Sequence, residues 1–197
     1  MDKEWFSWNK FSWYGTVLKW WLKNRLWFRL KKFTDLNIED AQNHFNNKIL
    51  WLLIDIDDCI APAYAEILEE NKEKIRELLN HWIKIWILSN WINLEKRCRE
   101  LTQMWVILCD TTKSKPDISS FNQAAEMIWV NPNNTLMIGD DISKDWWALQ
   151  DNWDNSMLWF VHVSPIWNKL WNIPKWKKIN YIAKVISRKI ANWMNWL

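Results

Sequence analysis

Three acidic residues follow a short apolar run in the first third of the chain. Residues 49–54 are apolar and span the length of a strand, and Asp55, Asp57 and Asp58 come directly after them. Such a run, bounded by turn residues, is typical of a buried strand in a parallel sheet, and open α/β sheets bind ligands just beyond these strands. Clustered carboxylates repel one another unless a proton or a cation neutralises them. The spacing leaves two interpretations open: a metal-binding catalytic site, or a strand-to-helix turn with spare acids.

Three further polar stretches lie at or near the ends of later predicted strands. A serine at a strand end opens a loop whose N–H groups can bind an oxyanion. A lysine before a helix can reach back to the sheet edge as a counter-charge for phosphate. Each stretch alone is a weak signal, whereas their order and placement together are specific. The residues are Ser89, Asn90, Lys115, Asp140, Asp141 and Asp145.

Strands and helices alternate along most of the chain. We predict strands near residues 50–55, 83–88, 105–109, 135–139 and 158–162. Helices are predicted near 63–81, 92–103, 118–128, 144–151 and 178–192, with a short capped helix within 34–48. This alternation predicts an α/β fold: a doubly wound, parallel, five-stranded Rossmann-like sheet with helices on both faces. In the last helix Ile179, Ile182, Ile186 and Ile190 share one face, which we expect to pack against the edge of the domain.

Tryptophan is far more abundant than usual, and glycine is far rarer. The 197 residues include 21 Trp and 2 Gly, whereas glycine normally makes up about 7% of a protein. Several tryptophans stand where chain geometry favours glycine: Trp82 and Trp129 at helix ends, Trp153 after a helix and Trp176 in a turn. Our hypothesis is that most of these positions are UGA codons, read as glycine in the source organism.

Charge divides the chain into two parts. Residues 1–33 hold eight basic and two acidic residues, and the remainder holds 18 basic and 21 acidic residues. We expect a single domain over 34–197, preceded by a basic aromatic segment over 1–33. Leu18, Leu22, Leu26 and Leu30 form one helical stripe in that segment, which predicts either an interfacial helix on an anionic membrane or a helix packed on the domain.

The three cysteines form no close pair, which favours a reduced cytoplasmic setting over a disulfide scaffold. No apolar run reaches 18 residues, so the sequence predicts no conventional membrane span. The first residues are charged and lack an apolar core, so we expect no secretory signal.

With these motifs in order, the chain resembles the haloacid dehalogenase (HAD) superfamily of phosphotransferases. The resemblance rests on Asp55-x-Asp57, Ser89, Lys115 and the stretch Gly139-Asp140 to Asp145. It implies phosphoryl transfer through an aspartyl-phosphate on Asp55. It also implies that Asp57 protonates the leaving group and then activates water.

The same resemblance implies a Mg²⁺ cofactor. The metal ligands would be Asp55, Asp140 and the backbone carbonyl of Asp57, with Asp141 and Asp145 in support. The residues implied to bind the phosphoryl group are Ser89, Asn90 and Lys115.

HAD proteins often carry a cap domain, but neither gap where it is inserted is long enough here, so we expect an open, capless site. Residues 35–165 look like the subfamily IIIA branch of YqeG-type and phosphatidylglycerophosphatase-like proteins. The matching stretches run through Asp55-Ile56-Asp57-Asp58 and Gly139-Asp140-Asp141.

This resemblance implies a phosphatidylglycerophosphate phosphatase of phospholipid biosynthesis, in the cytoplasm or peripheral on the inner face of the membrane, with no nucleic-acid partner. Contact with the membrane would run through residues 1–33. One alternative is a HAD phosphatase of a soluble sugar or nucleotide phosphate. The other is a non-catalytic binding module with a membrane-surface helix.

Overall fold

The structure is a computed structural model, and it describes residues 28–90, 94–112, 114–115, 117–129, 134–141, 145 and 159–194. Two predicted helices fall largely outside the described residues: the N-terminal one within 1–33, and the one at 144–151. Where the first is described, the prediction is wrong: Leu30, counted in its helical stripe, lies in a strand over Phe28–Leu30. Among the helices that are described, none combines the length and the apolar character needed to cross a membrane.

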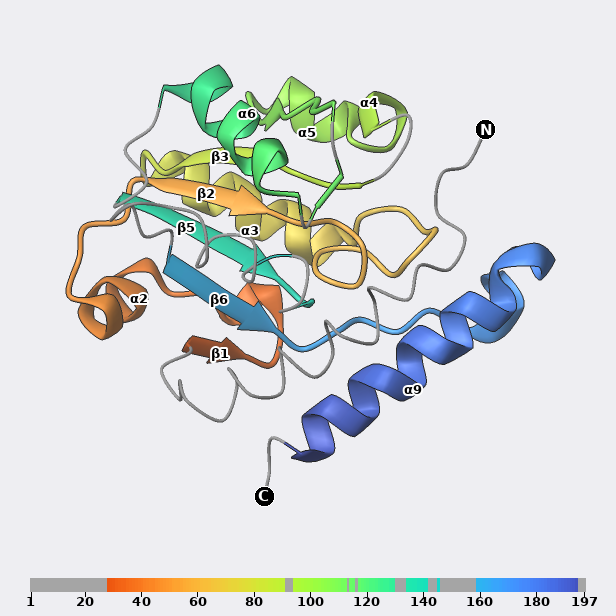
Figure 1. The fold of residues 1–197 in the computed structure, drawn as a ribbon. Helices are drawn as coiled ribbons and strands as arrows, with labels where there is room; N and C mark the ends of the chain where they lie inside the picture. The colour runs from red at the N-terminus through yellow and green to blue at the C-terminus, as the bar shows by residue number, and fades with distance from the viewer. Residues whose placement is uncertain are drawn as a thin grey trace.

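Six strands form one sheet in the order β1-β6-β5-β2-β3-β4, and every neighbouring pair is parallel (Figure 1). This confirms the predicted α/β sheet, with one strand more than expected. The additional strand, β1, lies near the end of the segment 1–33 and pairs with β6. The sequence did not predict it, because three residues are too few to show the alternating pattern of a strand. The strands are β1 (Phe28–Leu30), β2 (Trp51–Ile54), β3 (Lys84–Ile87), β4 (Ile107–Leu108), β5 (Thr135–Gly139) and β6 (Trp159–Val163).

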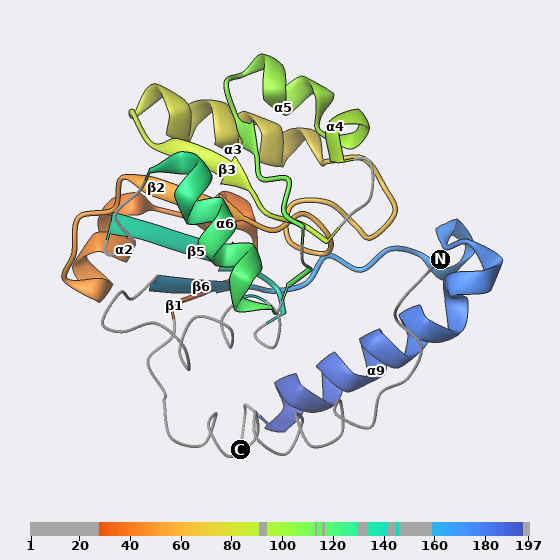
Figure 2. The same ribbon diagram turned by 45° about the horizontal axis from the view of Figure 1, so that its top comes forward.

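Helices cover both faces of the sheet. Figures 1 and 2 show α3 and α6 on opposite faces, as expected for a doubly wound fold. The α-helices are α2 (Ile38–Phe45), α3 (Glu69–Asn80), α4 (Leu94–Arg97), α5 (Arg99–Gln103), α6 (Ile118–Ile128) and α9 (Lys178–Met194). Short 3₁₀ turns are η1 (Phe33–Asp35), η3 (Leu170–Asn172) and η4 (Lys175–Lys177).

Two predicted helices differ from the structure. The helix expected at 63–81 begins only at Glu69, because Tyr64 takes a left-handed backbone conformation with φ 64°. The helix expected at 92–103 is divided into α4 and α5 at Cys98, whose φ of −102° and ψ of 15° interrupt the helical path. Residues 63–68 therefore form a loop beside the carboxyl end of β2.

The central strands are buried on both sides, as parallel sheets require. Strand β2 lies between β3 and β5. Strands β3 and β4 are added on one side of β2, and β5 and β6 are added on the other side. The carboxyl ends of β2 and β5 therefore lie at the point where the strand order reverses, which is the usual ligand site of such sheets. The core residues that line these strands include Leu52, Ile54, Ile85, Ile87, Leu136, Ile138, Val161 and Val163.

Three tryptophans occupy left-handed backbone positions. Trp82, Trp105 and Trp129 have φ of 62°, 69° and 49°, and all three side chains are largely exposed. Bulky side chains rarely adopt positive φ, whereas glycine does so at no steric cost. The structure thus confirms that Trp82 and Trp129 stand where the backbone favours glycine, which supports the codon hypothesis.

The last helix presents its isoleucines outward. Ile179, Ile182 and Ile186 on α9 are 80%, 41% and 53% exposed, so the prediction that this face packs on the domain is wrong. Tyr181 and Val185 make the apolar contacts with the body instead. Helical periodicity identifies residues that share a face, but it does not say which of two faces turns inward.

Candidate active site

Three carboxylates meet at the carboxyl edge of the sheet. Asp55 follows β2, Asp140 follows the neighbouring β5, and the Asp55 N–H donates to the carbonyl of Ile138 over 2.9 Å. Carboxylate oxygens of Asp55, Asp140 and Asp145 all lie within 4.8 Å of one another, and all three side chains are buried. Three negative charges this close, away from solvent, need a cation to balance them.

Lys115 supplies one positive charge to this cluster. Its Nζ lies 3.0 Å from Asp55 Oδ1 and 2.5 Å from Asp145 Oδ1, and the side chain is almost fully buried. Burial acts to lower the pKa of Lys115, but Asp145 and Asp55 outweigh it and hold the pKa above its ordinary value. Burial raises the pKa of Asp145 to about 6, although the ammonium beside it opposes the rise. The lysine is therefore a permanent cation at the centre of the site.

The backbone of Lys115 is held by Asn90. The Asn90 side chain accepts from the Lys115 N–H over 2.7 Å and donates to its carbonyl over 2.9 Å. Ser89 comes just before Asn90 in the loop after β3, and its side chain is half-buried. Asn90, predicted to bind phosphate, thus positions the lysine, while phosphate binding by Ser89 stays a prediction.

Gly139 lets Asp145 approach the sheet. A Cβ atom on Gly139 would lie 2.0 Å from Asp145 Oδ2, which no side chain can tolerate. Asp145 Oδ2 also accepts from the Asp141 N–H over 3.2 Å, so this carboxylate closes the loop after β5. Of the two residues predicted to support the site, Asp145 contacts Lys115 directly and Asp141 contributes its main chain.

Asp57 lies two residues beyond Asp55 and is held by an arginine from α4. Arg97 Nη1 lies 2.5 Å from Asp57 Oδ1, while its other nitrogens donate to the carbonyls of Ala65 and Pro62 over 2.9 and 3.2 Å. Burial raises the pKa of Asp57, and Arg97 offsets only part of the rise. No motif in the sequence points to Arg97, because its role depends on where α4 packs.

The loop after Asp57 is tied to the C-terminal helix. Asp58 is fully buried with φ 64°, and its carboxylate accepts from the Ala63 N–H over 3.0 Å and from Lys184 Nζ of α9 over 2.7 Å. The N–H of Ile166 donates to the Asp58 carbonyl over 2.8 Å. Sequence reasoning missed Lys184, since 126 residues separate the two partners.

The donor set fits a small hard cation. Mg²⁺ prefers oxygen ligands and is usually bound by one or two carboxylates together with water and phosphate oxygens. Asp55 and Asp140 provide buried carboxylates from adjacent strand ends. The nearest cysteine, Cys59, is buried, and burial among these acids raises the pKa of its thiol well above the ordinary value. A thiol held in its neutral form is a poor metal ligand and a poor nucleophile.

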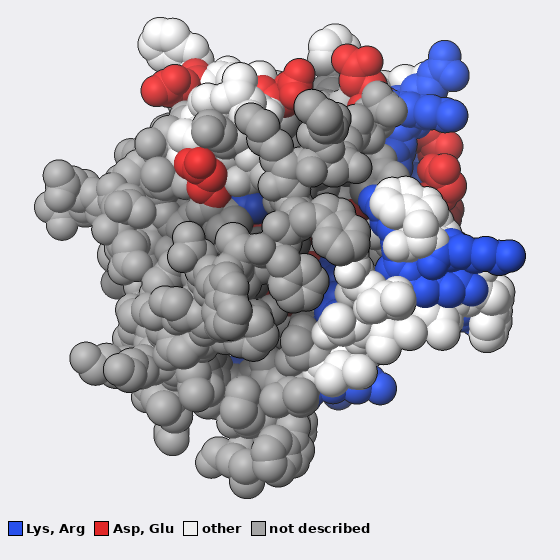
Figure 3. Space-filling model, turned by 45° about the vertical axis from the view of Figure 1, so that its right-hand side comes forward, with Lys and Arg blue, Asp and Glu red and all other residues white. Residues whose placement is uncertain are grey.

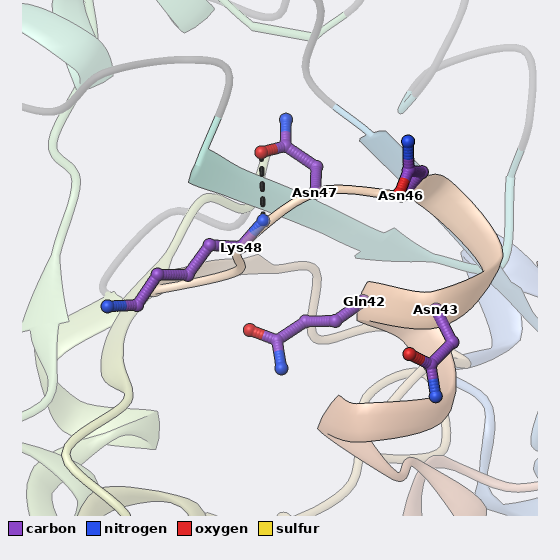
Figure 4. Close-up of a pocket in the computed structure, with 5 residues that line it drawn as sticks. All are labelled: Gln42, Asn43, Asn46, Asn47 and Lys48. Carbon is purple, nitrogen blue, oxygen red and sulfur yellow. Dashed lines mark hydrogen bonds between the residues drawn. The ribbon is translucent and has the colours of Figure 1, made fainter.

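A second hollow, of about 530 Å³, lies near the opposite edge of the sheet (Figure 4). Its lining comes from the end of α2 and the segment leading into β2, ahead of the strand rather than after it. Amide side chains and one lysine form this lining, and it includes no carboxylate. The lining residues are Gln42, Asn43, Asn46, Asn47 and Lys48.

No family model matches the sequence, and no curated protein does so either. Among solved structures, the chain is similar to an uncharacterised protein from Listeria monocytogenes serotype 4b, with 16% identity, TM-score 0.43, and coverage of 61% of this chain and 92% of that one. The cobalt-bound deoxy-D-mannose-octulosonate 8-phosphate phosphatase of Haemophilus influenzae has 18% identity, TM-score 0.38, and coverage of 49% and 61%. A HAD-superfamily hydrolase from Geobacter sulfurreducens has 13% identity, TM-score 0.32, and coverage of 47% and 79%.

Proposed function

We propose that the protein is a metal-dependent phosphomonoester hydrolase that works through an aspartyl-phosphate on Asp55. The observation that carries the proposal is the cluster of Asp55, Asp140 and Asp145 at the switch point of a parallel sheet, where Asp55 and Asp145 contact the ammonium of Lys115. A buried carboxylate beside a fixed cation is suited to attack phosphorus, because the cation attracts the phosphoryl oxygens and offsets charge in the transition state.

In the first step, an Asp55 oxygen forms a bond to phosphorus and the bond from phosphorus to the ester oxygen breaks. The leaving alkoxide takes a proton from Asp57, whose raised pKa favours the protonated form needed for this role. In the second step, Asp57 removes a proton from water as the water attacks phosphorus. The bond between phosphorus and the Asp55 oxygen then breaks, which releases phosphate and restores both carboxyl groups.

A divalent cation would be held by Asp55 and Asp140, with the backbone carbonyl of Asp57 as a further oxygen ligand. When bound, Mg²⁺ supplies positive charge to the phosphoryl oxygens and reduces repulsion between phosphate and carboxylates. Lys115 and Asp145 hold their positions independently of the cation through the contact between them. Asn90 keeps the lysine aimed at the site.

We infer from the sequence that the site carries no cap domain, which favours a bulky phosphomonoester. Within the described part of the chain, the segment between β2 and α3 is a short loop, and no cap domain stands over the strand ends. We propose phosphatidylglycerophosphate as the substrate, hydrolysed to phosphatidylglycerol at the inner face of the cytoplasmic membrane. The buried free thiols of the described residues agree with a reduced compartment.

The test is phosphate release from phosphatidylglycerophosphate vesicles in Mg²⁺, run beside soluble sugar and nucleotide phosphates. Asp55→Asn removes the nucleophile, and Asp40→Asn, an exposed acid on α2, is the matched control. Release from vesicles that Asp55→Asn abolishes and Asp40→Asn preserves supports the lipid substrate. Release only from soluble esters keeps the mechanism and replaces the substrate. Equal rates in the Asp55→Asn and unmodified proteins contradict the proposal.

A further inference from the structure

Apolar and basic side chains share one exposed surface at the C-terminal end of the chain. We call this surface the α9 face. It consists of the outward side of α9 and the two short turns before it. Its exposed apolar members include Leu170, Ile179, Ile182 and Ile186, and its lysines include Lys169, Lys175, Lys177, Lys178 and Lys189.

The other side of α9 explains why the isoleucines turn outward. Tyr181 is buried, and its hydroxyl accepts from the N–H of Asn168 over 2.6 Å. Lys184 reaches the buried carboxylate of Asp58. These two polar anchors lie on the body side of the helix, opposite Ile182 and Ile186. The apolar side is thus left to solvent, the reverse of an ordinary amphipathic helix on a globular protein.

The charged residues of the segment that carries this face have a single sign. From Asn155 to Leu197 the sequence holds seven lysines and arginines and no acidic residue. Figure 3, which turns this side of the molecule forward, shows lysine and arginine atoms gathered around uncharged ones at the right of the view, with acidic atoms also present at its upper right. A partner for this surface must therefore be both apolar and anionic.

We propose that the α9 face binds an anionic membrane surface, with Ile179, Ile182 and Ile186 entering the boundary between head groups and acyl chains. Helices with an isoleucine face flanked by lysines bind lipid in this way, because each lysine can keep its ammonium among the head groups. A second copy would bring lysines against lysines, and residues 1–33 carry the same sign of charge. Nucleic acid offers no apolar layer for three isoleucines.

The α9 face also lies toward the carboxyl edge of the sheet, which holds the candidate active site. Figure 1 shows α9 beyond the carboxyl ends of β2 and β6. Contacts tie the C-terminal segment to the loop after Asp57: Lys184 binds Asp58, and Asn168 Nδ2 donates to the Ala63 carbonyl over 2.7 Å. A membrane bound here would face the candidate site. This step alone rests on the proposed function; the binding surface itself does not.

The test places a fluorescent label at one position of the full chain. The three native cysteines are buried, so a new surface cysteine can be labelled selectively with a polarity-sensitive dye. Ile186→Cys puts the dye on the α9 face, and Met127→Cys on α6, with a similar exposure of 50%, is the control. Each protein is mixed with vesicles of phosphatidylcholine alone or of equal parts phosphatidylcholine and phosphatidylglycerol.

We expect the Ile186→Cys dye to shift to the blue on anionic vesicles only, while the Met127→Cys dye stays unchanged. Replacing Ile179, Ile182 and Ile186 together by glutamine should weaken co-sedimentation with these vesicles by at least about tenfold. Three results would each overturn the proposal. The first is vesicle binding without a shift of the dye at position 186, and the second is unchanged vesicle binding by the triple variant. The third is a dimer of the unmodified protein that the triple variant no longer forms. Hydrolysis of a soluble phosphomonoester by the same proteins reports separately on the proposed function, because these substitutions lie outside the acidic cluster.

Discussion

Replacing Arg97 by methionine should destabilise the protein strongly, although no sequence motif includes this residue. The side chain is only 7% exposed and makes three hydrogen bonds, one to Asp57 and two to backbone carbonyls. A hydrogen bond to a charged group contributes about 1.5–3 kcal/mol, and a neutral one about 1 kcal/mol. The side chain of Asp57 is 25% exposed, so we take the lower end of the range for the charged hydrogen bond. The free energy of unfolding should therefore fall by about 3 kcal/mol.

The assay is urea unfolding followed by far-ultraviolet circular dichroism. Arg76→Met is the matched control, because Arg76 makes an exposed ion pair with Glu69 and should lose less than about 1 kcal/mol. In the Asp57→Asn protein, Arg97→Met should lower the free energy of unfolding by less than it does in the unmodified protein, because no carboxylate is left unpaired.

The pH dependence of this loss tests its electrostatic part. Arg97 stabilises the ionised form of Asp57, so its contribution disappears once that carboxyl is protonated. Burial raises the pKa of Asp57 despite Arg97, and removal of Arg97 raises it further. The stability deficit of Arg97→Met should therefore shrink as pH falls from neutral through the acid range. A decrease in unfolding free energy below about 0.5 kcal/mol at neutral pH, or one that does not change with pH, would show that the contact between Arg97 and Asp57 does not stabilise the fold.

Three further predictions follow from local geometry. Trp129→Gly should raise the unfolding free energy by about 1 kcal/mol because it relieves a positive φ, whereas Trp176→Gly, outside that backbone region, should not; equal effects in urea unfolding would contradict this. Gly139→Ala should destabilise the protein through the clash with Asp145, and Asp145→Ala should relieve it, so an additive double variant would contradict the contact. Burial raises the pKa of Cys109 from 9.0 to about 12, so the folded state keeps a proton that the unfolded state loses. Cys109 should then contribute a fall in stability above pH 9 of up to about 1.4 kcal/mol per pH unit, and Cys109→Ala should make the total decline shallower by that amount.

The strand ends were predictable because their signals are local. The apolar run before Asp55 and the one before Asp140 identify β2 and β5, and parallel strands must bring their carboxyl ends to one edge. Lys115 could be assigned to the same edge from its place before a helix. The acidic cluster therefore follows from sequence order and sheet topology together.

The contacts that hold this cluster could not be read from the sequence. Arg97, Asn90 and Lys184 act on residues that lie 25 to 126 positions away, and their roles depend on how helices and loops pack. The α9 face is a further example. The helical spacing of its isoleucines is visible in the sequence, but the contacts of Tyr181 and Lys184 with the body determine which side of the helix turns outward. Assignment to subfamily IIIA and to a lipid substrate likewise stays a prediction.

The most direct test of the account is to trap the proposed intermediate on Asp55. The unmodified protein would be mixed with a soluble phosphomonoester and Mg²⁺, treated with borohydride during turnover, and digested for mass spectrometry. Borohydride reduces an aspartyl-phosphate to homoserine, so we expect homoserine at position 55 and at no other aspartate position. Phosphate release without that change, or homoserine at Asp57 or Asp140 instead, would contradict the central claim.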